Sequence, residues 1–389
     1  MGLPLAMSTW GVEELNAIQK VVDSGQFTMN KNVEIFEERF ASYHNSKYCV
    51  MVNSGSSANL LAVAAFFHHS SKRLKRGDEV IVPAISWATT YSPLYHYGLK
   101  VKFVDVDSKT LNIDCDVLKR AISNKTKAIF LVNLLGNPNK FDIINNAVDG
   151  KDIIIIEDNC ESLGATFMGK KTGSFGDVGT SSLFFSHHIS TMEGGAIITD
   201  DDEIYHILLS LRSHGWTRHL PIDNTLCKKG DDPFYESFRF ILPGYNLRPL
   251  ELSGAIGLEQ LEKLDSFIHQ RRENATYYQK IFRTNDKVCI PDEVGSSSWF
   301  AFPFVLNRNY SDKDRRKIIK EFYKNQIECR PIVAGNFVRN KAVEWFDYEV
   351  FENLSNADWV HQNGFMVGNH HYDITKELDK IQNIFEEIL

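Results

Sequence analysis

Short apolar runs alternate with stretches of helical periodicity from residue 47 onward. The runs are "KYCVMVNSG", "DEVIVPA", "KVKFVDVD", "KAIFLVNLLG" and "DIIIIEDN", and helix-like segments such as "SSANLLAVAAFFHH" and "KFDIINNAV" separate them. Continuous apolar strands between helices are typical of a mostly parallel sheet that is buried on both faces. "TSSLFF" and "GAIITDD" predict two further strands on either side of residues 186–194. The pattern therefore predicts an α/β fold whose functional groups gather where the strands end.

The pattern changes after residue 247. "LRPLELSGAIGLEQLEKLDSFIHQRRENATYYQKIF" has apolar residues near every third or fourth position, which predicts a long helix. It is followed by the apolar "SSWFAFPFVL", the helix-like "SDKDRRKIIKEFYKNQ", the strand-like "IECRPIV" and the amphipathic "TKELDKIQNIFEEIL". We therefore expect a large domain over residues 1–250, which includes an N-terminal segment. Residues 251–389 are expected to form the long linking helix and a small C-terminal α/β domain.

Composition narrows the class of protein. The net charge is −7 and the Lys and Arg residues are scattered, which argues against nucleic-acid binding. No apolar run approaches the about 20 residues of a membrane span, and the N-terminus lacks the basic and apolar regions of a secretory signal. A cytoplasmic protein without membrane contact is expected. The six cysteines are too widely spaced for a metal clip, so we expect reduced thiols, no metal site and no iron–sulfur cluster.

Two polar segments lie where predicted strands end. "NSGSSANL" leads from a strand into a helix, where Gly55, Ser56 and free backbone N–H groups suit an anion. The alternative is a plain serine cap on the helix. Asp158 ends the apolar run "IIIIED", where an uncompensated carboxylate is unfavourable. It either caps the next segment or pairs with a protonated heterocyclic nitrogen.

The adjacent histidines in "SSLFFSHHISTMEGG" raise a separate question. A metal would need a third ligand at a suitable spacing, and none is visible. Ser182 and Ser186 stand close enough in sequence to hold a phosphate beside them. Of two other pairs, His68-His69 is expected on a helix surface, while the role of His370-His371 is left open.

Several motifs in order resemble the sugar aminotransferase and dehydratase family of fold-type I pyridoxal phosphate enzymes. They are "SGSSANLLA", "PAISWATT", "EDNCESLGA", "EGGAIITDD" and "GYNLRPLELSGAIGLEQL", and they extend over almost the whole chain. Most of that family has a lysine six residues before the acid of "EGG", and here that position is His187. The exchange is similar to the 3-dehydratase branch. A related branch carries an iron–sulfur cluster, and the scattered cysteines do not fit it.

The resemblance implies an aspartate aminotransferase-like fold and a cofactor, pyridoxal or pyridoxamine 5′-phosphate, that is held without a covalent bond. It also implies a GDP-linked 4-keto-6-deoxy sugar as substrate, L-glutamate as amine donor, and a homodimer with shared active sites. His187 would be the acid–base catalyst, because histidine ordinarily titrates near neutrality. His188 is expected to be structural.

The remaining roles also follow from the resemblance. The implied cofactor-binding residues are Gly55, Ser56, Trp87, Asp158, Glu161, Ser182, Ser186 and, from the partner subunit's copy, Asn246. The implied substrate-binding residues are Arg330, which would bind the glutamate carboxylate, and His214 and Arg218, which would contact the sugar or diphosphate. Glu161 stands where the aminotransferases usually have Gln, which leaves the charge state of the cofactor open.

Three alternatives remain at this point. A sugar aminotransferase would need a lysine at the cofactor, and His187 argues against it. A dehydratase for a GDP-linked heptose would share the same motifs. A catalytically silent cofactor-binding protein would be expected to lose some of Trp87, Asp158, Ser182, His187 and Arg330, and the chain has all of them.

Overall fold

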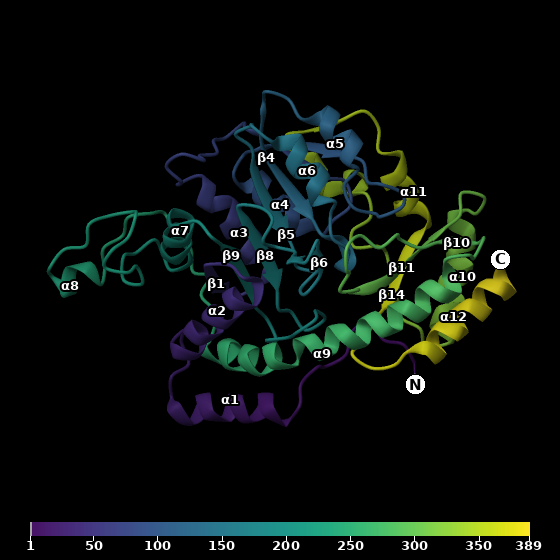
Figure 1. Cartoon of the computed structure of the whole chain (residues 1–389), viewed down its shortest axis with the longest axis horizontal. Helices are drawn as coiled ribbons and strands as arrows, with labels where there is room; N and C mark the ends of the chain where they lie inside the picture. Colours follow the sequence, from purple (N-terminus) through teal and green to yellow (C-terminus); the bar gives the residue numbers. More distant parts are fainter. Residues whose placement is uncertain (1) are drawn as a thin grey trace.

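The computed structural model describes residues 2–389 and is built around one large sheet (Figure 1). In spatial order its strands are β1 (Tyr48–Val52), β9 (Gly195–Thr199), β8 (Val178–Ser182), β5 (Ile154–Asp158), β4 (Thr126–Val132), β2 (Glu79–Pro83), β3 (Lys100–Val104) and β13 (Tyr348–Val350). Strand β9 is antiparallel to β1 and β8, and the other neighbours pair in parallel. The prediction of a mostly parallel α/β sheet is confirmed.

Both faces of this sheet are covered, as continuous apolar strands require. Val80 and Val82 pack with α3 (Gly55–Phe66) on one face. Ile81, between them, packs on the other face with α5 (Cys115–Ala121) and α6 (Phe141–Val148). Helix α3 is itself buried on most sides, because α4 (Ala88–His96) and α7 (Asp202–Arg212) contact it as well as the strands.

A second, four-stranded sheet follows the 32-residue helix α9 (Glu251–Phe282), which runs along the molecule in Figure 1. Its strands, in spatial order, are β10 (Val288–Cys289), β11 (Ala301–Leu306), β14 (Gly364–Gly368) and β12 (Cys329–Arg330). Helices α10 (Asp312–Lys324) and α12 (Thr375–Ile388) share its apolar core. Leu3 joins the same core by bridging to Ile327, and β13 returns from this half to the large sheet. The division at residue 250 stays a prediction.

The remaining elements lie outside the two sheets. They are α1 (Val12–Ser24), α2 (Lys31–His44), α8 (Pro233–Glu236), α11 (Ser355–Asn363), the hairpin of β6 (Thr166–Phe167) and β7 (Lys170–Lys171), and the 3₁₀ helices η1 (Leu134–Gly136), η2 (Phe337–Arg339) and η3 (Lys341–Trp345). The segment that carries α8 projects from the body of the molecule (Figure 1). Across residues 2–389, no helix combines the length and apolarity needed to cross a membrane.

Three predicted elements differ in extent from the observed ones. The long helix begins at Glu251 rather than near residue 247, and only Cys329–Arg330 of "IECRPIV" is a strand. Strand β8 ends at Ser182, because the backbone of Leu183 turns to bond with Gly194 and Thr191. That turn begins the segment that contains the histidine pair.

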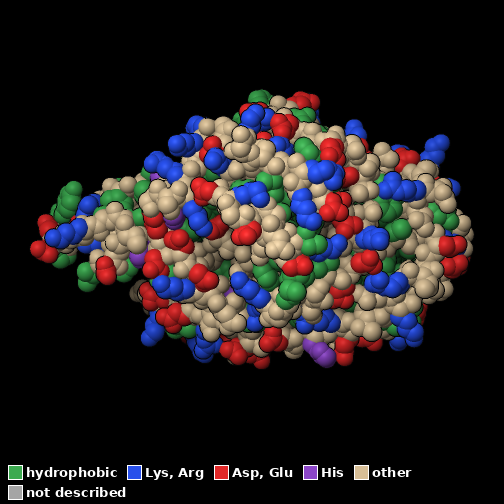
Figure 2. Space-filling model, turned by 45° about the horizontal axis from the view of Figure 1, so that its top comes forward, with side chains coloured by type: hydrophobic (Ala, Val, Ile, Leu, Met, Phe, Trp, Pro, Cys, Tyr) green, Lys and Arg blue, Asp and Glu red, His purple; other side chains and the backbone are tan. Residues whose placement is uncertain are grey.

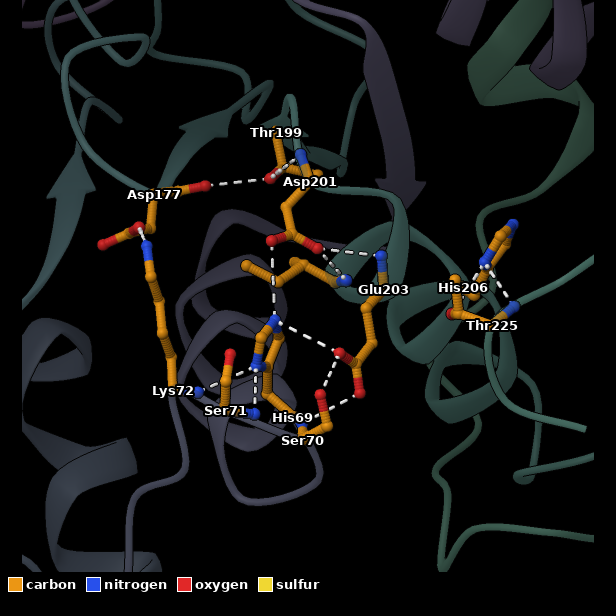
Figure 3. A network of polar contacts seen from close by, with 11 residues as sticks. His69, Ser70, Ser71, Lys72, Asp177, Thr199, Asp201, Glu203, His206 and Thr225 are labelled. Carbon is orange, nitrogen blue, oxygen red and sulfur yellow. Dashed lines mark hydrogen bonds and ion pairs between the residues drawn. The ribbon is translucent and has the colours of Figure 1, made fainter.

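The prediction that His68-His69 lies on a helix surface is wrong for His69, which is 4% exposed. Its Nδ1 accepts backbone N–H groups of Ser71 (3.2 Å) and Lys72 (3.0 Å), so Nε2 carries the proton of the neutral ring. Nε2 lies 3.5 Å from Asp201 Oδ2 and 3.6 Å from Glu203 Oε2 (Figure 3). His69 therefore ties the loop after α3 to the start of α7, a contact between segments that are distant in sequence.

Replacing His69 by leucine is expected to lower the free energy of unfolding by about 1 kcal/mol, because two partly buried N–H groups, those of Ser71 and Lys72, lose their acceptor. Urea unfolding followed by circular dichroism measures the change. His68→Leu, at the partly buried neighbour, is the matched control and should have a much smaller effect. Equal losses in the two variants would contradict a specific role for the His69 ring.

Candidate functional site

A cavity of about 260 Å³ opens where β1, β5 and β8 end. Nine of the residues predicted from the sequence line it: Gly55, Ser56, Trp87, Asp158, Glu161, Ser182, Ser186, His187 and Arg330. They come from six separate stretches of the chain. The carboxyl ends of parallel strands and the start of one helix bring them together, as is usual for sites in open α/β sheets.

The start of α3 forms one wall of this cavity. Ser54 caps the helix by accepting the N–H of Ser57 (3.1 Å), and Ser56 donates to Thr89 Oγ1 (3.0 Å). A Cβ atom on Gly55 would lie 2.5 Å from the Cβ of Ser182, so only glycine allows this approach of helix and strand. The free N–H groups of the helix and the nearby hydroxyl groups of Ser56 and Ser182 are suited to a phosphate.

Asp158 lies at the base of the cavity and is 5% exposed. Its Oδ2 accepts from Asn59 Nδ2 (2.8 Å) and Thr90 Oγ1 (2.7 Å), and its Oδ1 accepts from the backbone N–H of Cys160 (3.1 Å). These three donors stabilise the ionised carboxylate. Trp87, at the start of α4, also lines the cavity and is 52% exposed, so much of its ring is free to stack on a ligand.

Glu161 and Arg330 are two further ionisable residues of the lining. Burial raises the pKa of Glu161 to about 7, although the positive charge of Arg330 and the N–H of Leu135 (3.0 Å) favour the ionised form. Arg330 Nε is buried and has no hydrogen-bond partner among residues 2–389. An unpaired guanidinium N–H in a cavity is available to a ligand carboxylate.

His187 lies in the turn after β8, where its ring is 5.2 Å from the ring of Phe300 and 6.2 Å from that of Phe184. Its Nδ1 is buried and makes no hydrogen bond. Burial, followed by the positive charge of Arg330, lowers the pKa of His187 to about 3. This differs from the titration near neutrality that was expected from the sequence. At neutral pH the ring is therefore uncharged and can accept a proton.

His188 has a different environment. Its side chain is fully buried, does not line the cavity, and has Nε2 at 3.1 Å from the carbonyl oxygen of Ser298. Burial lowers the pKa of His188 well below its ordinary value. Two adjacent histidines are thus separated into one that faces the cavity and one that packs inside.

Three predicted residues do not line the cavity of their own chain: Asn246, His214 and Arg218. Asn246 pairs with Ser213, and its Oδ1 accepts from Arg248 Nε (3.0 Å). The guanidinium of Arg218 lies 4.0 Å from the ring centre of Trp216. All three lie between α7 and α9, in the part of the chain that also carries α8.

Sequence reasoning missed several residues of the site, notably Asn59, Thr90 and Phe300. The one available signal was Asn59, a polar residue inside the apolar helical run "ANLLAVAAF". Thr90 and Phe300 carried none. Across residues 2–389, no three His, Cys, Asp or Glu side chains cluster in a way that could hold a metal ion.

Known proteins resemble this chain over its full length. The sequence profile of the DegT/DnrJ/EryC1/StrS aminotransferase family matches residues 9–388. The GDP-4-keto-6-deoxy-D-mannose 3-dehydratase of Yersinia pseudotuberculosis is 55% identical over 389 residues, which are 100% of this chain and 99% of that protein. The protein of the same name from Escherichia coli O55:H7 is 54% identical over 385 residues, 98% of this chain and 99% of that one.

Solved structures agree with these matches. GDP-4-keto-6-deoxymannose-3-dehydratase with bound GDP-perosamine, and the same enzyme with a trapped PLP-glutamate geminal diamine, each have a TM-score of 0.96 and 53% identity. Each covers 98% of this chain and 100% of the solved chain. A variant in which a serine and the histidine after it are replaced by asparagine and lysine has a TM-score of 0.95 and 53% identity, covering 97% and 100%.

Glu161 should make the stability of the protein without ligand depend on pH. Its pKa is about 7 in the folded protein against an ordinary 4.5, so the folded state binds its proton more tightly. The resulting stabilisation is complete below pH 4.5 and is lost as the pH rises through about 7. When the pH rises from 5 to 8, the free energy of unfolding measured with urea should fall by on the order of 1 kcal/mol more in the wild type than in Glu161→Gln. Parallel pH profiles for the two proteins would contradict this assignment.

Proposed function

The chain belongs to the DegT/DnrJ/EryC1/StrS aminotransferase family, and we propose that it is a pyridoxamine phosphate-dependent 3-dehydratase of GDP-4-keto-6-deoxy-mannose. It removes the C3 hydroxyl of the sugar, and glutamate then restores the amine form of the cofactor. The product is the 3-deoxy-4-keto sugar, which we place on the route to colitose. The observation that carries the proposal is that His187 lines the cavity whereas no lysine does among residues 2–389.

The residues of the cavity fit the cofactor. The start of α3, with Ser56 and Ser182, would bind the phosphate; Asp158 would pair with the ring nitrogen, and Trp87 would stack on the ring. When bound, the cofactor supplies an amine that condenses with the C4 ketone and a ring that accepts electrons. Ser186 would add a further phosphate contact. No side chain of the lining can form the covalent link that a lysine makes, so binding is non-covalent.

His187 would move the proton at the cofactor methylene carbon. A neutral imidazole is the form that accepts this proton, and its lowered pKa ensures that form at neutral pH. The protonated ring can then donate to the departing C3 hydroxyl, a step that the low pKa favours because the imidazolium is a strong acid. In the solved variant described above, the substituted histidine directly follows a serine. In this chain His187 follows Ser186, whereas His188 follows another histidine, which supports His187 as the base.

Arg330 and Glu161 would act on the second half of the cycle. The free Nε–H of Arg330 suits the carboxylate of glutamate. Glu161, with a pKa of about 7, can be protonated or ionised at the pH of the reaction. It can therefore share a proton with the phenolic oxygen of the cofactor.

We further propose a homodimer with shared sites. Large apolar side chains on the projecting segment are exposed, including Ile222 (88%), Phe234 (84%) and Tyr235 (63%). Apolar side chains gather on this projection in Figure 2, while charges of both signs are interspersed over the visible face of the body. Exposed apolar groups of this size favour burial against a partner. In such a dimer, Asn246, His214 and Arg218 would contact the cavity of the partner chain instead of their own.

The alternatives are less well supported. An aminotransferase of this family would need a lysine in the lining, and a silent protein would have no reason to hold a neutral His187 against the cavity. A heptose substrate would require a different sugar from the one named for the two relatives. The cytoplasmic location stays a prediction.

The proposal is tested by incubating the protein with GDP-4-keto-6-deoxy-mannose, pyridoxamine phosphate and glutamate. A dehydratase yields the 3-deoxy-4-keto sugar, an aminotransferase yields a 4-amino sugar, and a silent protein yields neither. His187→Asn should bind the cofactor but lose at least about 10²–10⁴-fold in product formation and in solvent-hydrogen exchange at the cofactor methylene. His188→Asn is the control and should retain exchange. Normal exchange in His187→Asn would reject His187 as the base.

Shared sites predict complementation between two inactive variants. Asn246→Ala should impair the partner's phosphate contact, and His187→Asn should impair proton transfer, so a hybrid dimer contains one site that lacks both defects. Co-refolded mixtures should recover up to about a quarter of wild-type activity, since half the dimers are hybrids with one intact site. Sedimentation at assay concentration gives the oligomeric state. A monomer, or mixtures no more active than the parents, would overturn the dimer.

A further inference from the structure

Asn59 is a buried polar residue in the middle of an apolar helix. It is 2% exposed, and its neighbours Ala58, Leu61 and Ala62 are fully buried. Its side-chain amide is oriented by the groups on either side: Nδ2 donates to Asp158 Oδ2 (2.8 Å), and Oδ1 accepts from Thr180 Oγ1 (2.6 Å). A carboxylate can only accept hydrogen bonds, so the amide cannot be reversed without losing the contact to Asp158.

The hydrogen bonds to Asp158 are distributed unequally over its two oxygens. Oδ2 receives two donors, Asn59 and Thr90, which occupy both of its lone pairs. Oδ1 receives one, the N–H of Cys160, and retains one lone pair. The arrangement leaves one acceptor position on the carboxylate, on Oδ1.

We propose that Asn59, oriented by Thr180, is a positioning residue that holds Asp158 by its Oδ2 and leaves Oδ1 to pair with the protonated ring nitrogen of the cofactor. This rests on the proposed function, in which Asp158 makes that pair. Asn59 lines the cavity beside Asp158, and the proposed role acts through its hydrogen bond to Asp158. Its donor stabilises the charged carboxylate in a buried site, and its absence weakens the hold on the cofactor ring and the ring's capacity to accept electrons.

The structure offers variants that separate this role from packing. Asn59→Leu removes the donor at similar size, and the hydroxyl of Thr180 keeps a second acceptor, the carbonyl oxygen of Glu157 at 3.2 Å. Asn59→Asp keeps the shape and replaces the amide by a carboxyl group. Facing Asp158, that group repels when ionised and can donate when protonated. Thr180→Val removes the hydroxyl that orients the amide, together with the longer contact of that hydroxyl to the carbonyl oxygen of Glu157.

The first measurement is the dissociation constant of pyridoxamine phosphate, obtained by fluorescence titration without substrate. Asn59→Leu should weaken binding about tenfold to a hundredfold, because one charge-assisted hydrogen bond is lost. Thr180→Val should weaken it less. Thr126→Val is the matched control: this buried threonine also bonds a carboxylate, Glu79 at 2.8 Å, but does not line the cavity. It should lower stability and leave the dissociation constant unchanged.

The second measurement is the pH dependence of the same constant in Asn59→Asp. The ratio of its dissociation constant to that of the wild type should be large at pH 8 and should fall toward pH 6, because the new carboxyl group gains the proton with which it can donate to Asp158. Tyr91, Cys160 and Glu161 are the other titratable groups that sense the charge of Asp158, and the wild type, which shares them, gives the reference profile. At saturating cofactor, kcat should fall in Asn59→Leu while KM for the sugar stays unchanged.

The inference would be overturned if Asn59→Leu bound pyridoxamine phosphate as tightly as the wild type. It would also be overturned if Asn59→Asp weakened binding by the same factor at both pH values. Either result would leave the proposed function intact. If Asn59→Leu does not fold, the pH profile of Asn59→Asp decides alone. If the wild type itself neither binds pyridoxamine phosphate nor forms the 3-deoxy product, the proposed function fails instead.

Discussion

The site depends on the close approach of the start of α3 to the end of β8 and the start of β9. A Cβ on Gly55 would lie 2.5 Å from Ser182, and a Cβ on Gly195 would lie 2.3 Å from the carbonyl oxygen of Ser54. Two glycines therefore allow helix and strands to meet at backbone distance. This contact places the N–H groups of α3 beside Ser182. One turn along the helix it places Asn59 against Asp158 and Thr180, on β5 and β8. A small displacement of α3 would disturb both parts of the site.

Electrostatics then divides the roles among the titratable groups of the cavity. Burial acts on both His187 and Glu161 and favours their neutral forms, which lowers one pKa to about 3 and raises the other to about 7. Arg330 adds to the effect on His187 and opposes it on Glu161. Burial, with a smaller contribution from Arg330, thus keeps the His187 ring neutral, and Arg330 limits the rise of the pKa of Glu161. The carboxylate oxygens of Asp158 accept three hydrogen bonds, from Asn59, Thr90 and the N–H of Cys160. His187, Glu161 and Asp158 thus have different environments within one cavity, which suits them to different chemical roles.

The histidine pair shows how the fold assigns roles to identical neighbours. Strand β8 ends at Ser182, and the chain then forms a turn at residues 185–186 and a bend at residues 187–189, so alternation along a strand does not separate the two rings. His188 is instead held inside by the Ser298 carbonyl, and Phe300 packs against both rings. The segment that contains Ser298 and Phe300 leads into β11 of the second sheet. Residues of the second sheet and the segment before it, Arg330 and Phe300, therefore line part of the site.

The sequence alone determined the α/β class, the mostly parallel sheet and nine residues of the cavity. Apolar strands, a glycine-serine turn and spaced motifs are local patterns, so they can be recognised in the sequence without the fold. Only the tertiary structure decided how His187 titrates, because its lowered pKa comes from burial and from Arg330, far away in the chain. The tertiary structure also decided the burial of His69, which was predicted to lie on a surface but packs against the start of α7. It likewise decided the role of Asn59, whose partners lie 99 and 121 residues away in the sequence. Desolvation and hydrogen bonding depend on which groups meet in space, and that information appears only when distant segments pack together.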